Sequence, residues 1–201
     1  MYMRTALENS PTKEKLLDAA QRLVLAKGFA GTAVDDICKA ARLTKGSFFH
    51  YFESKDELGV ELLTRYCTAT KQAFAAGCCR KEKDPLKRVY GLLDFLSGMA
   101  EKNPHGCLMG GMAQELSDTH PEIRSLCAKG FSEVSASVGH DLAAAKKLYA
   151  SRADWDPKSL ADYFVAVMQG SALLGKVRRD PKAATNGIRH FKQYLKQIFG
   201  R

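Results

Sequence analysis

The sequence predicts an all-α protein made of a small N-terminal helix-turn-helix domain and a larger helical domain. Apolar residues recur at helical spacing through most of the 201 residues, and no stretch alternates with the period of a strand. Three Asp-Pro pairs also stand where helices begin. The expected boundary separates residues 1–60, a three-helix unit, from residues 61–201.

Four helices are expected in the first part of the chain. They are an opening helix that ends before Gly28, two short helices at Val34–Ala41 and Lys45–Tyr51, and a long helix from Lys55. Each follows a side chain that can accept a hydrogen bond from the first turn of the helix. These expected caps are Thr12, Thr32 (with Asp35 in the position of a capping box), Thr44 and Ser54. Two short helices joined by a tight turn predict a helix-turn-helix.

Longer helices are expected in the rest of the chain. Asp84-Pro85, Asp156-Pro157 and Asp180-Pro181 each place a capping carboxylate before a proline suited to a first helical turn. The expected helices are 85–102, 108–116, 121–149, 157–176 and 181–199.

The segment Leu43–Lys55, with the sequence LTKGSFFHYFESK, is polar at its start and aromatic in its middle. Phe48 and Phe52 are four residues apart, so both can face the domain while small polar residues face outward. An apolar back and a small polar front suit a helix that enters the major groove of DNA. The residues expected to contact DNA are Thr32, Thr44, Lys45, Gly46, Ser47, Phe49, Tyr51 and Lys55.

Net charge adds little to this prediction. The chain carries a formal charge of +9, but residues 1–60 contribute only +1 and residues 61–201 contribute +8. DNA binding therefore depends on local placement, with Lys45, Lys55 and the Thr32 hydroxyl directed to phosphates and Ser47 to a base edge.

The motifs G-F at 28–29, T-A-V-D-D-I at 32–37 and K-G-S-F-F-H-Y-F-E-S-K at 45–55 resemble the TetR family of bacterial transcriptional regulators. The resemblance implies a homodimer that binds a pseudo-palindromic operator, and a C-terminal domain that senses an inducer. It also implies dimerisation through the last two helices, with Phe164, Val167, Ser171, Leu174, Phe191 and Leu195 at the interface. Many members have Tyr where this chain has Phe49, which would pack on a thymine methyl group instead.

The six cysteines, at 38, 67, 78, 79, 107 and 127, include no C-x-x-C pair and no zinc-finger spacing, so no metal or cofactor is expected. Without a secretion signal, the thiols are expected to be reduced and the protein cytoplasmic, with no membrane span. Cys107 differs because it begins a helix, where the helix dipole stabilises a thiolate.

Three short patches, at His105–Leu108, Ala113–Asp118 and Gly170–Lys176, resemble a TetR subgroup that represses electrophile-detoxifying reductases. In that subgroup the cysteine matching Cys107 is the sensor thiol, and the resemblance implies that Lys176 supplies a nearby cation. The inducer would then be a reactive electrophile or oxidant.

Two alternatives stay open at this point. In the first, the same fold responds to a non-covalent ligand in an apolar cavity among the helices between 85 and 176, lined by Phe95, Met99, Met109, Met112, Phe131, Tyr163 and Met168. In the second, the chain is a cysteine-dependent helical reductase. The sequence disfavours an enzyme because it has no C-x-x-C pair, no nucleotide-phosphate loop and no metal-ligand set.

Overall fold

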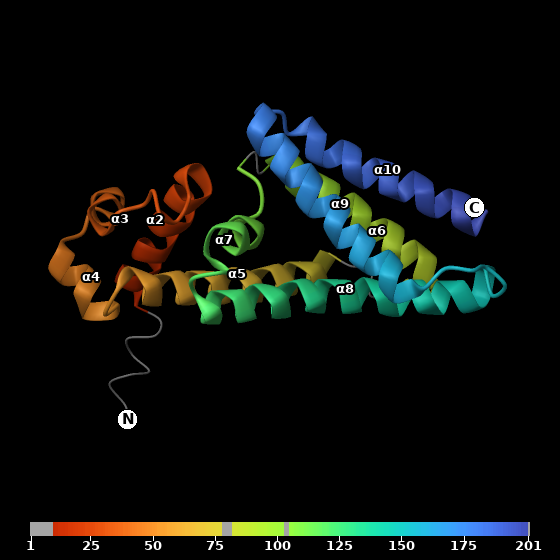
Figure 1. Ribbon diagram of the computed structural model, residues 1–201, viewed down its shortest axis with the longest axis horizontal. Helices are drawn as coiled ribbons and strands as arrows, with labels where there is room; N and C mark the ends of the chain where they lie inside the picture. The colour runs from red at the N-terminus through yellow and green to blue at the C-terminus, as the bar shows by residue number, and fades with distance from the viewer. Residues whose placement is uncertain (1–9, 78–81, 103–104, 201) are drawn as a thin grey trace, which may run out of the picture. The chain divides into compact units, whose positions relative to one another are not determined.

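The computed structural model describes residues 10–77, 82–102 and 105–200, and Cys78 and Cys79 lie outside these ranges. The described residues form helices and contain no strand, which confirms the all-α prediction (Figure 1). The helices are α2 (Pro11–Lys27), α3 (Val34–Ala41), α4 (Lys45–Tyr51), α5 (Lys55–Gly77), α6 (Pro85–Lys102), α7 (Leu108–Leu116), α8 (Pro121–Tyr149), α9 (Pro157–Arg178) and α10 (Lys182–Phe199).

The chain divides into two compact units. The N-terminal unit comprises Met1–Cys67 and Leu108–Cys127, and the C-terminal unit comprises Thr68–Cys107 and Ala128–Arg201. Helix α7 therefore belongs to the N-terminal unit, although it lies far along the sequence from α2, α3 and α4. A functional boundary near residue 60 stays a prediction.

The core of the N-terminal unit holds α4 against its neighbours. Phe48 and Phe52 are fully buried, as their spacing predicted, and their ring centroids lie 5.4 Å apart. Leu16, Leu58 and Leu62 of α2 and α5 are also fully buried in this unit. Helix α4 is thus fixed by its aromatic face. A seven-residue helix needs such support because it is too short to be stable alone.

Of the four helix caps predicted in the first part of the chain, those at Thr12 and Thr32 are wrong and those at Thr44 and Ser54 are confirmed. Helix α2 begins one residue after Ser10, whose hydroxyl accepts from the Thr12 amide, so Ser10 is the cap and Thr12 is not. Helix α3 is capped at Ala33, whose amide donates to the Asp36 carboxylate at 3.3 Å. The hydroxyls of Thr44 and Ser54 accept from amides three residues on, as predicted.

The C-terminal unit is a helical bundle with one continuous apolar core. Its buried residues come from α6, α8, α9 and α10: Leu86, Val89, Leu92, Leu93, Leu96, Val138, Leu142, Ala145, Leu160, Ala161, Phe164, Ile188, Phe191, Leu195 and Phe199. Two of the three predicted Asp-Pro starts hold, since the Asp84 and Asp156 carboxylates accept amides in the first turns of α6 and α9. The third is shifted by one residue, because α10 begins at Lys182 and Pro181 is its cap. Within the described residues, no helix has the length and apolar character to cross a membrane.

Candidate nucleic-acid interface and sensor segment

The outer face of α4 is open to solvent. Phe49 is 56 % exposed, whereas the adjoining Phe48 is fully buried, and the two rings meet edge to face with centroids 5.2 Å apart. An aromatic ring held out beside a buried one is available to contact a partner. At the start of the helix, the Thr44 hydroxyl accepts the Ser47 amide at 3.1 Å and lies 3.0 Å from the Ser47 hydroxyl.

Lys45 is exposed on the same face but has an acidic neighbour. Its Nζ lies 2.8 Å from the Asp35 carboxylate of α3, and both side chains are more than 60 % exposed. The hydrogen bond and the charge of Asp35 raise the pKa of Lys45. Lys45 is therefore a full cation whose charge is balanced by Asp35, a partner that the sequence reading missed.

Tyr51 and Lys55 both have partners within the N-terminal unit. The Tyr51 hydroxyl lies 2.8 Å from the Ser10 hydroxyl, which joins the end of α4 to the start of α2. Lys55 Nζ donates to the Phe29 carbonyl at 3.2 Å and lies 4.6 Å from the centroid of the Phe29 ring. In this arrangement the Lys55 ammonium supports the loop between α2 and α3.

The expected role of Thr32 is corrected by its burial. The Thr32 side chain is fully buried, and its hydroxyl donates to the Gly28 carbonyl at 2.7 Å. A hydroxyl used inside the loop cannot reach a DNA phosphate. Thr32 instead closes the turn that leads into α3.

Cys107 lies directly before the first residue of α7 and is partly exposed. Gly106 precedes it with φ +84°, and a Cβ at Gly106 would lie 3.5 Å from the Ala172 carbonyl oxygen and 3.8 Å from two side-chain carbons of Lys176. The chain leading to Cys107 therefore packs against α9 at Lys176. The structure thus brings together the two segments that the sequence reading paired.

The other described cysteines lie in packed surroundings. Burial raises the pKa of the Cys38 thiol, and the nearby Asp35 carboxylate adds to this. Cys127 is buried and donates to the Met109 carbonyl at 3.6 Å, and the Cys67 sulfur lies 3.8 Å from the Met109 sulfur. A raised pKa disfavours the reactive thiolate, so Cys38 suits a structural role.

The residues predicted to line one apolar cavity divide between the units. Met109 and Met112 are buried in the N-terminal unit, whereas Phe95, Met99, Phe131 and Met168 belong to the C-terminal unit. Tyr163 is more than half exposed on α9, and its ring lies 6.1 Å from that of Tyr194 on α10. Tyr163 therefore belongs to the surface that α9 and α10 share.

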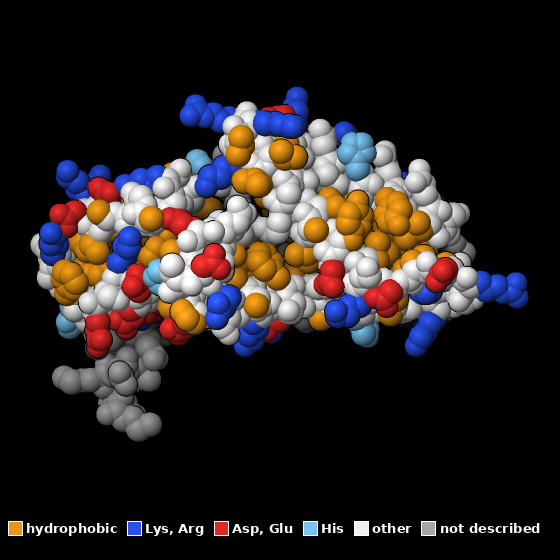
Figure 2. All heavy atoms as spheres, viewed as in Figure 1, with side chains coloured by type: hydrophobic (Ala, Val, Ile, Leu, Met, Phe, Trp, Pro, Cys, Tyr) orange, Lys and Arg blue, Asp and Glu red, His pale blue; other side chains and the backbone are white. Residues whose placement is uncertain are grey.

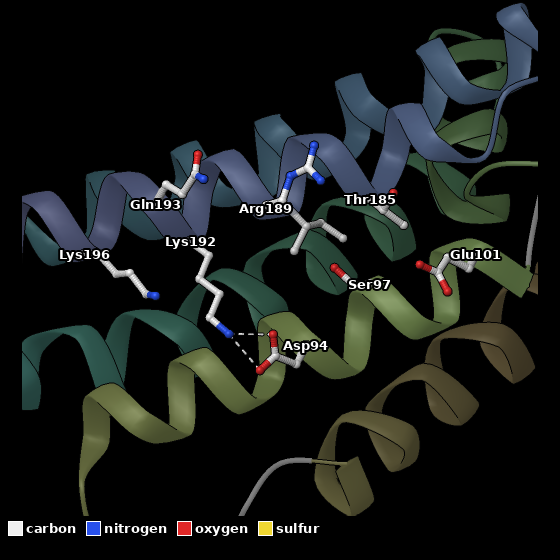
Figure 3. Close-up of a pocket in the computed structure, with 9 residues that line it drawn as sticks. Asp94, Ser97, Glu101, Thr185, Arg189, Lys192, Gln193 and Lys196 are labelled. Atoms are coloured by element: carbon white, nitrogen blue, oxygen red, sulfur yellow. Dashed lines mark hydrogen bonds and ion pairs between the residues drawn. The ribbon is translucent and has the colours of Figure 1, made fainter. Parts of the chain in front are cut away.

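Two of the grooves among the described residues have a volume of about 410 Å³ each, and the lining of both includes charged side chains. One lies between α6 and α10, where Lys192 binds both carboxylate oxygens of Asp94, at 2.6 and 2.8 Å (Figure 3). The other, formed by the start of α5 and the turn before α8, contains Asp56, with His120 3.6 Å away. Neither has the methionine and aromatic lining that was predicted.

The predicted dimer residues also need correction. Phe164, Phe191 and Leu195 are buried in the core of their own chain, with the two phenylalanine rings 5.1 Å apart. Val167 packs against the same core, and Ser171 is buried where α9 approaches Gly187 of α10. These five side chains therefore join α9 to α10 within one chain.

Leu174 alone of the predicted dimer residues is well exposed, at 45 %. Figure 2 shows hydrophobic side chains gathered over α9 and α10 on the visible face. The large apolar residues exposed on these two helices are Tyr163, Leu173, Leu174, Val177 and Tyr194. An apolar surface of this kind marks a site of association.

Comparison with known proteins identifies the family. Residues 85–191 match the model described as "Tetracyclin repressor-like, C-terminal domain", and residues 16–62 match that of "Bacterial regulatory proteins, tetR family". The chain belongs to the TetR family. It is therefore a DNA-binding transcriptional regulator rather than an enzyme, which confirms the resemblance seen in its motifs.

Three relatives show how far the likeness extends. An uncharacterised helix-turn-helix regulator of Lactococcus lactis is 30 % identical over 84 % of this chain and 85 % of its own length. The transcriptional repressor NemR of Escherichia coli is 28 % identical over 92 % of this chain and 94 % of its own length. The crystal structure of reduced NemR matches 90 % of this chain and 96 % of the NemR chain, with a TM-score of 0.75. The crystal structure of a TetR regulatory protein from Rhodobacter sphaeroides matches 92 % of this chain and 98 % of its own, with 27 % sequence identity and a TM-score of 0.81.

Proposed function

We propose that this TetR-family regulator is a repressor that binds a pseudo-palindromic operator as a homodimer and leaves it when an electrophile modifies Cys107. The observation that carries the DNA-binding part is the two-sided α4, with Phe48 buried and Phe49 and Lys45 exposed. Relatives named as repressors, NemR and DhaR, support repression over activation. A protein that binds chromosomal DNA also works in the cytoplasm, as expected from the sequence.

The outer face of α4 offers three kinds of DNA contact. Lys45 would approach a phosphate, and Phe49 would pack on a thymine methyl group in the major groove. Gly46 has no side chain in the first turn of α4, and the space around it is open, since a Cβ there would meet only the Thr44 hydroxyl at 3.6 Å. The DNA backbone or a base edge can therefore approach the helix closely at this position. Ser47 and Tyr51 carry hydroxyls that can exchange their present partners for a base edge or a phosphate.

Two copies of α4 are needed to read a pseudo-palindrome. In helix-turn-helix dimers the two reading helices engage successive major grooves about 34–36 Å apart. The exposed apolar residues of α9 and α10, with Leu174 and Val177 at their centre in this proposal, supply the surface for a second copy.

Cys107 is proposed as the sensor because of its place in the chain. Its partial exposure admits a small electrophile, it lies directly before the first residue of α7, and Lys176 lies against the preceding residue. The thiolate sulfur adds to the β-carbon of an α,β-unsaturated carbonyl compound such as a quinone. A C–S bond forms, the π electrons move to the carbonyl oxygen, and a proton from water completes the addition.

The test uses a DNA duplex selected by the unmodified protein from a random library. Fluorescence anisotropy then measures its affinity before and after treatment with N-ethylmaleimide, which alkylates thiolates by the same addition. We expect wild type and Cys67→Ser to release the duplex, and Cys107→Ser to keep it. Release from Cys107→Ser equal to that from wild type would exclude Cys107 as the sensor.

A further inference from the structure

The loop between α2 and α3, residues 28–33, is held by a carboxylate from far along the chain. Glu115 of α7 accepts the Phe29 amide on Oε2 at 2.8 Å and the Ala30 amide on Oε1 at 2.5 Å. Two successive backbone amides that point at one anion form a nest, and a charged acceptor makes these hydrogen bonds stronger than neutral ones. Gly28, with φ +83°, lets the backbone turn so that both amides reach the carboxylate.

The same loop is held from its other side by α5. The Phe29 carbonyl accepts from Lys55, and the Phe29 ring packs so closely on Gly59 that a Cβ there would lie 2.7 Å from it. Phe29 thus has its amide bound by α7 while its carbonyl and ring are bound by α5. Both supports lie within the N-terminal unit.

The loop sets the position of the helix-turn-helix. The Thr32 amide donates to the Phe29 carbonyl at 3.1 Å, and α3 begins two residues after Thr32. Helix α3 packs on α4, and Asp35 of α3 holds Lys45 of α4. A shift of the Phe29–Ala30 peptide therefore moves the start of α3 and, with it, the face that reads DNA.

Helix α7 connects this support to the sensor segment. Glu115 lies eight residues after Cys107, about 12 Å along a helix. Because a helix moves as a rigid element over that distance, displacement of its first turn also displaces the Glu115 carboxylate. The hydrogen bonds to the loop, which lose most of their strength within about 1 Å, would then break.

We propose that Glu115 is a positioning residue that holds the loop in the DNA-binding arrangement, and that modification of Cys107 lowers operator affinity by withdrawing its carboxylate. The second part rests on the proposed function of Cys107. The first part concerns contacts within the N-terminal unit and stands without it.

The test compares Glu115→Gln with Glu122→Gln, which removes the same charge from an exposed position in the first turn of α8. Anisotropy with the selected duplex measures affinity with and without N-ethylmaleimide. We expect unmodified Glu115→Gln to bind about tenfold more weakly than wild type, and Glu122→Gln to bind like wild type. Alkylation should then weaken Glu115→Gln by a smaller factor than it weakens wild type, since the contact is already lost.

Hydrogen exchange of the wild-type peptide 28–33 gives a second readout that needs no variant. We expect its amides to exchange slowly in the unmodified protein and faster after alkylation. Wild-type affinity for unmodified Glu115→Gln would overturn the positioning role. Exchange that alkylation leaves unchanged would overturn the withdrawal of the carboxylate. If alkylation leaves wild-type affinity unchanged, the sensing role of Cys107 fails, while weak binding by unmodified Glu115→Gln still supports the positioning role.

Discussion

Removal of Asp35 should strengthen DNA binding. Asp35 holds Lys45 at 2.8 Å on the proposed reading face, so its charge cancels the one that Lys45 would present to a phosphate. In Asp35→Asn, Lys45 becomes free to displace a counterion from DNA. Each such contact steepens the fall of log affinity with log salt concentration by about 0.9, so the two half-sites together steepen it by about 1.8.

The affinity gain follows from the slope. If wild type and Asp35→Asn bind equally at about 1 M salt, a slope change of about 1.8 gives a gain of about 60-fold at 0.1 M. Anisotropy titrations of the selected duplex across this salt range measure both quantities. The double variant Asp35→Asn/Lys45→Ala is the control, and it should have the affinity and slope of Lys45→Ala alone.

An unchanged slope in Asp35→Asn would refute this reasoning, because it would mean that Lys45 does not approach a phosphate in the complex. Weaker binding at every salt concentration would show that Asp35 is needed to hold α3 and α4 in register. The same gain in the double variant would place the effect of Asp35 elsewhere than on Lys45.

Three further variants test other parts of the structure. The hydrogen bond from Lys27 lowers the pKa of Asp36 below its ordinary value of 3.8, so the ionised carboxylate stabilises the fold above that pH. The melting temperature of wild type should therefore fall as the pH drops below 3.8, and that of Asp36→Asn should fall less. Gly59→Ala would force a methyl group against the Phe29 ring, and denaturant unfolding should show a loss of about 1–3 kcal/mol. Leu174→Glu places a charge in the proposed dimer surface, so sedimentation should find folded monomers, and their melting temperature should no longer depend on protein concentration. A stable dimer would place the interface elsewhere.

The sequence predicted those features that depend on neighbouring residues. The i, i+4 spacing of Phe48 and Phe52 identified the buried face of α4, and the Asp156-Pro157 pair located the start of α9. The cap of α2 was missed because Ser10 and Thr12 are both good acceptors two residues apart. Only the backbone geometry decides between them.

Features that depend on distant residues were not predictable in the same way. Apolar periodicity showed that Phe164 and Phe191 are buried, but a period does not say whether the covering helix belongs to the same chain or to a second copy. The Asp35–Lys45 pair joins two helices, and Glu115 is 86 residues from the Phe29 amide that it binds. No local pattern marks such contacts, because the fold alone brings these groups together.

Modification of Cys107 is proposed to release the protein from its operator. The most direct measurement titrates the DNA-bound protein with N-ethylmaleimide, and follows duplex release by anisotropy and the occupancy of each cysteine by peptide mass spectrometry. We predict that the released fraction rises in proportion to the modified fraction of Cys107. Release that instead follows Cys67 or another cysteine, or full modification of Cys107 with the duplex still bound, would contradict it.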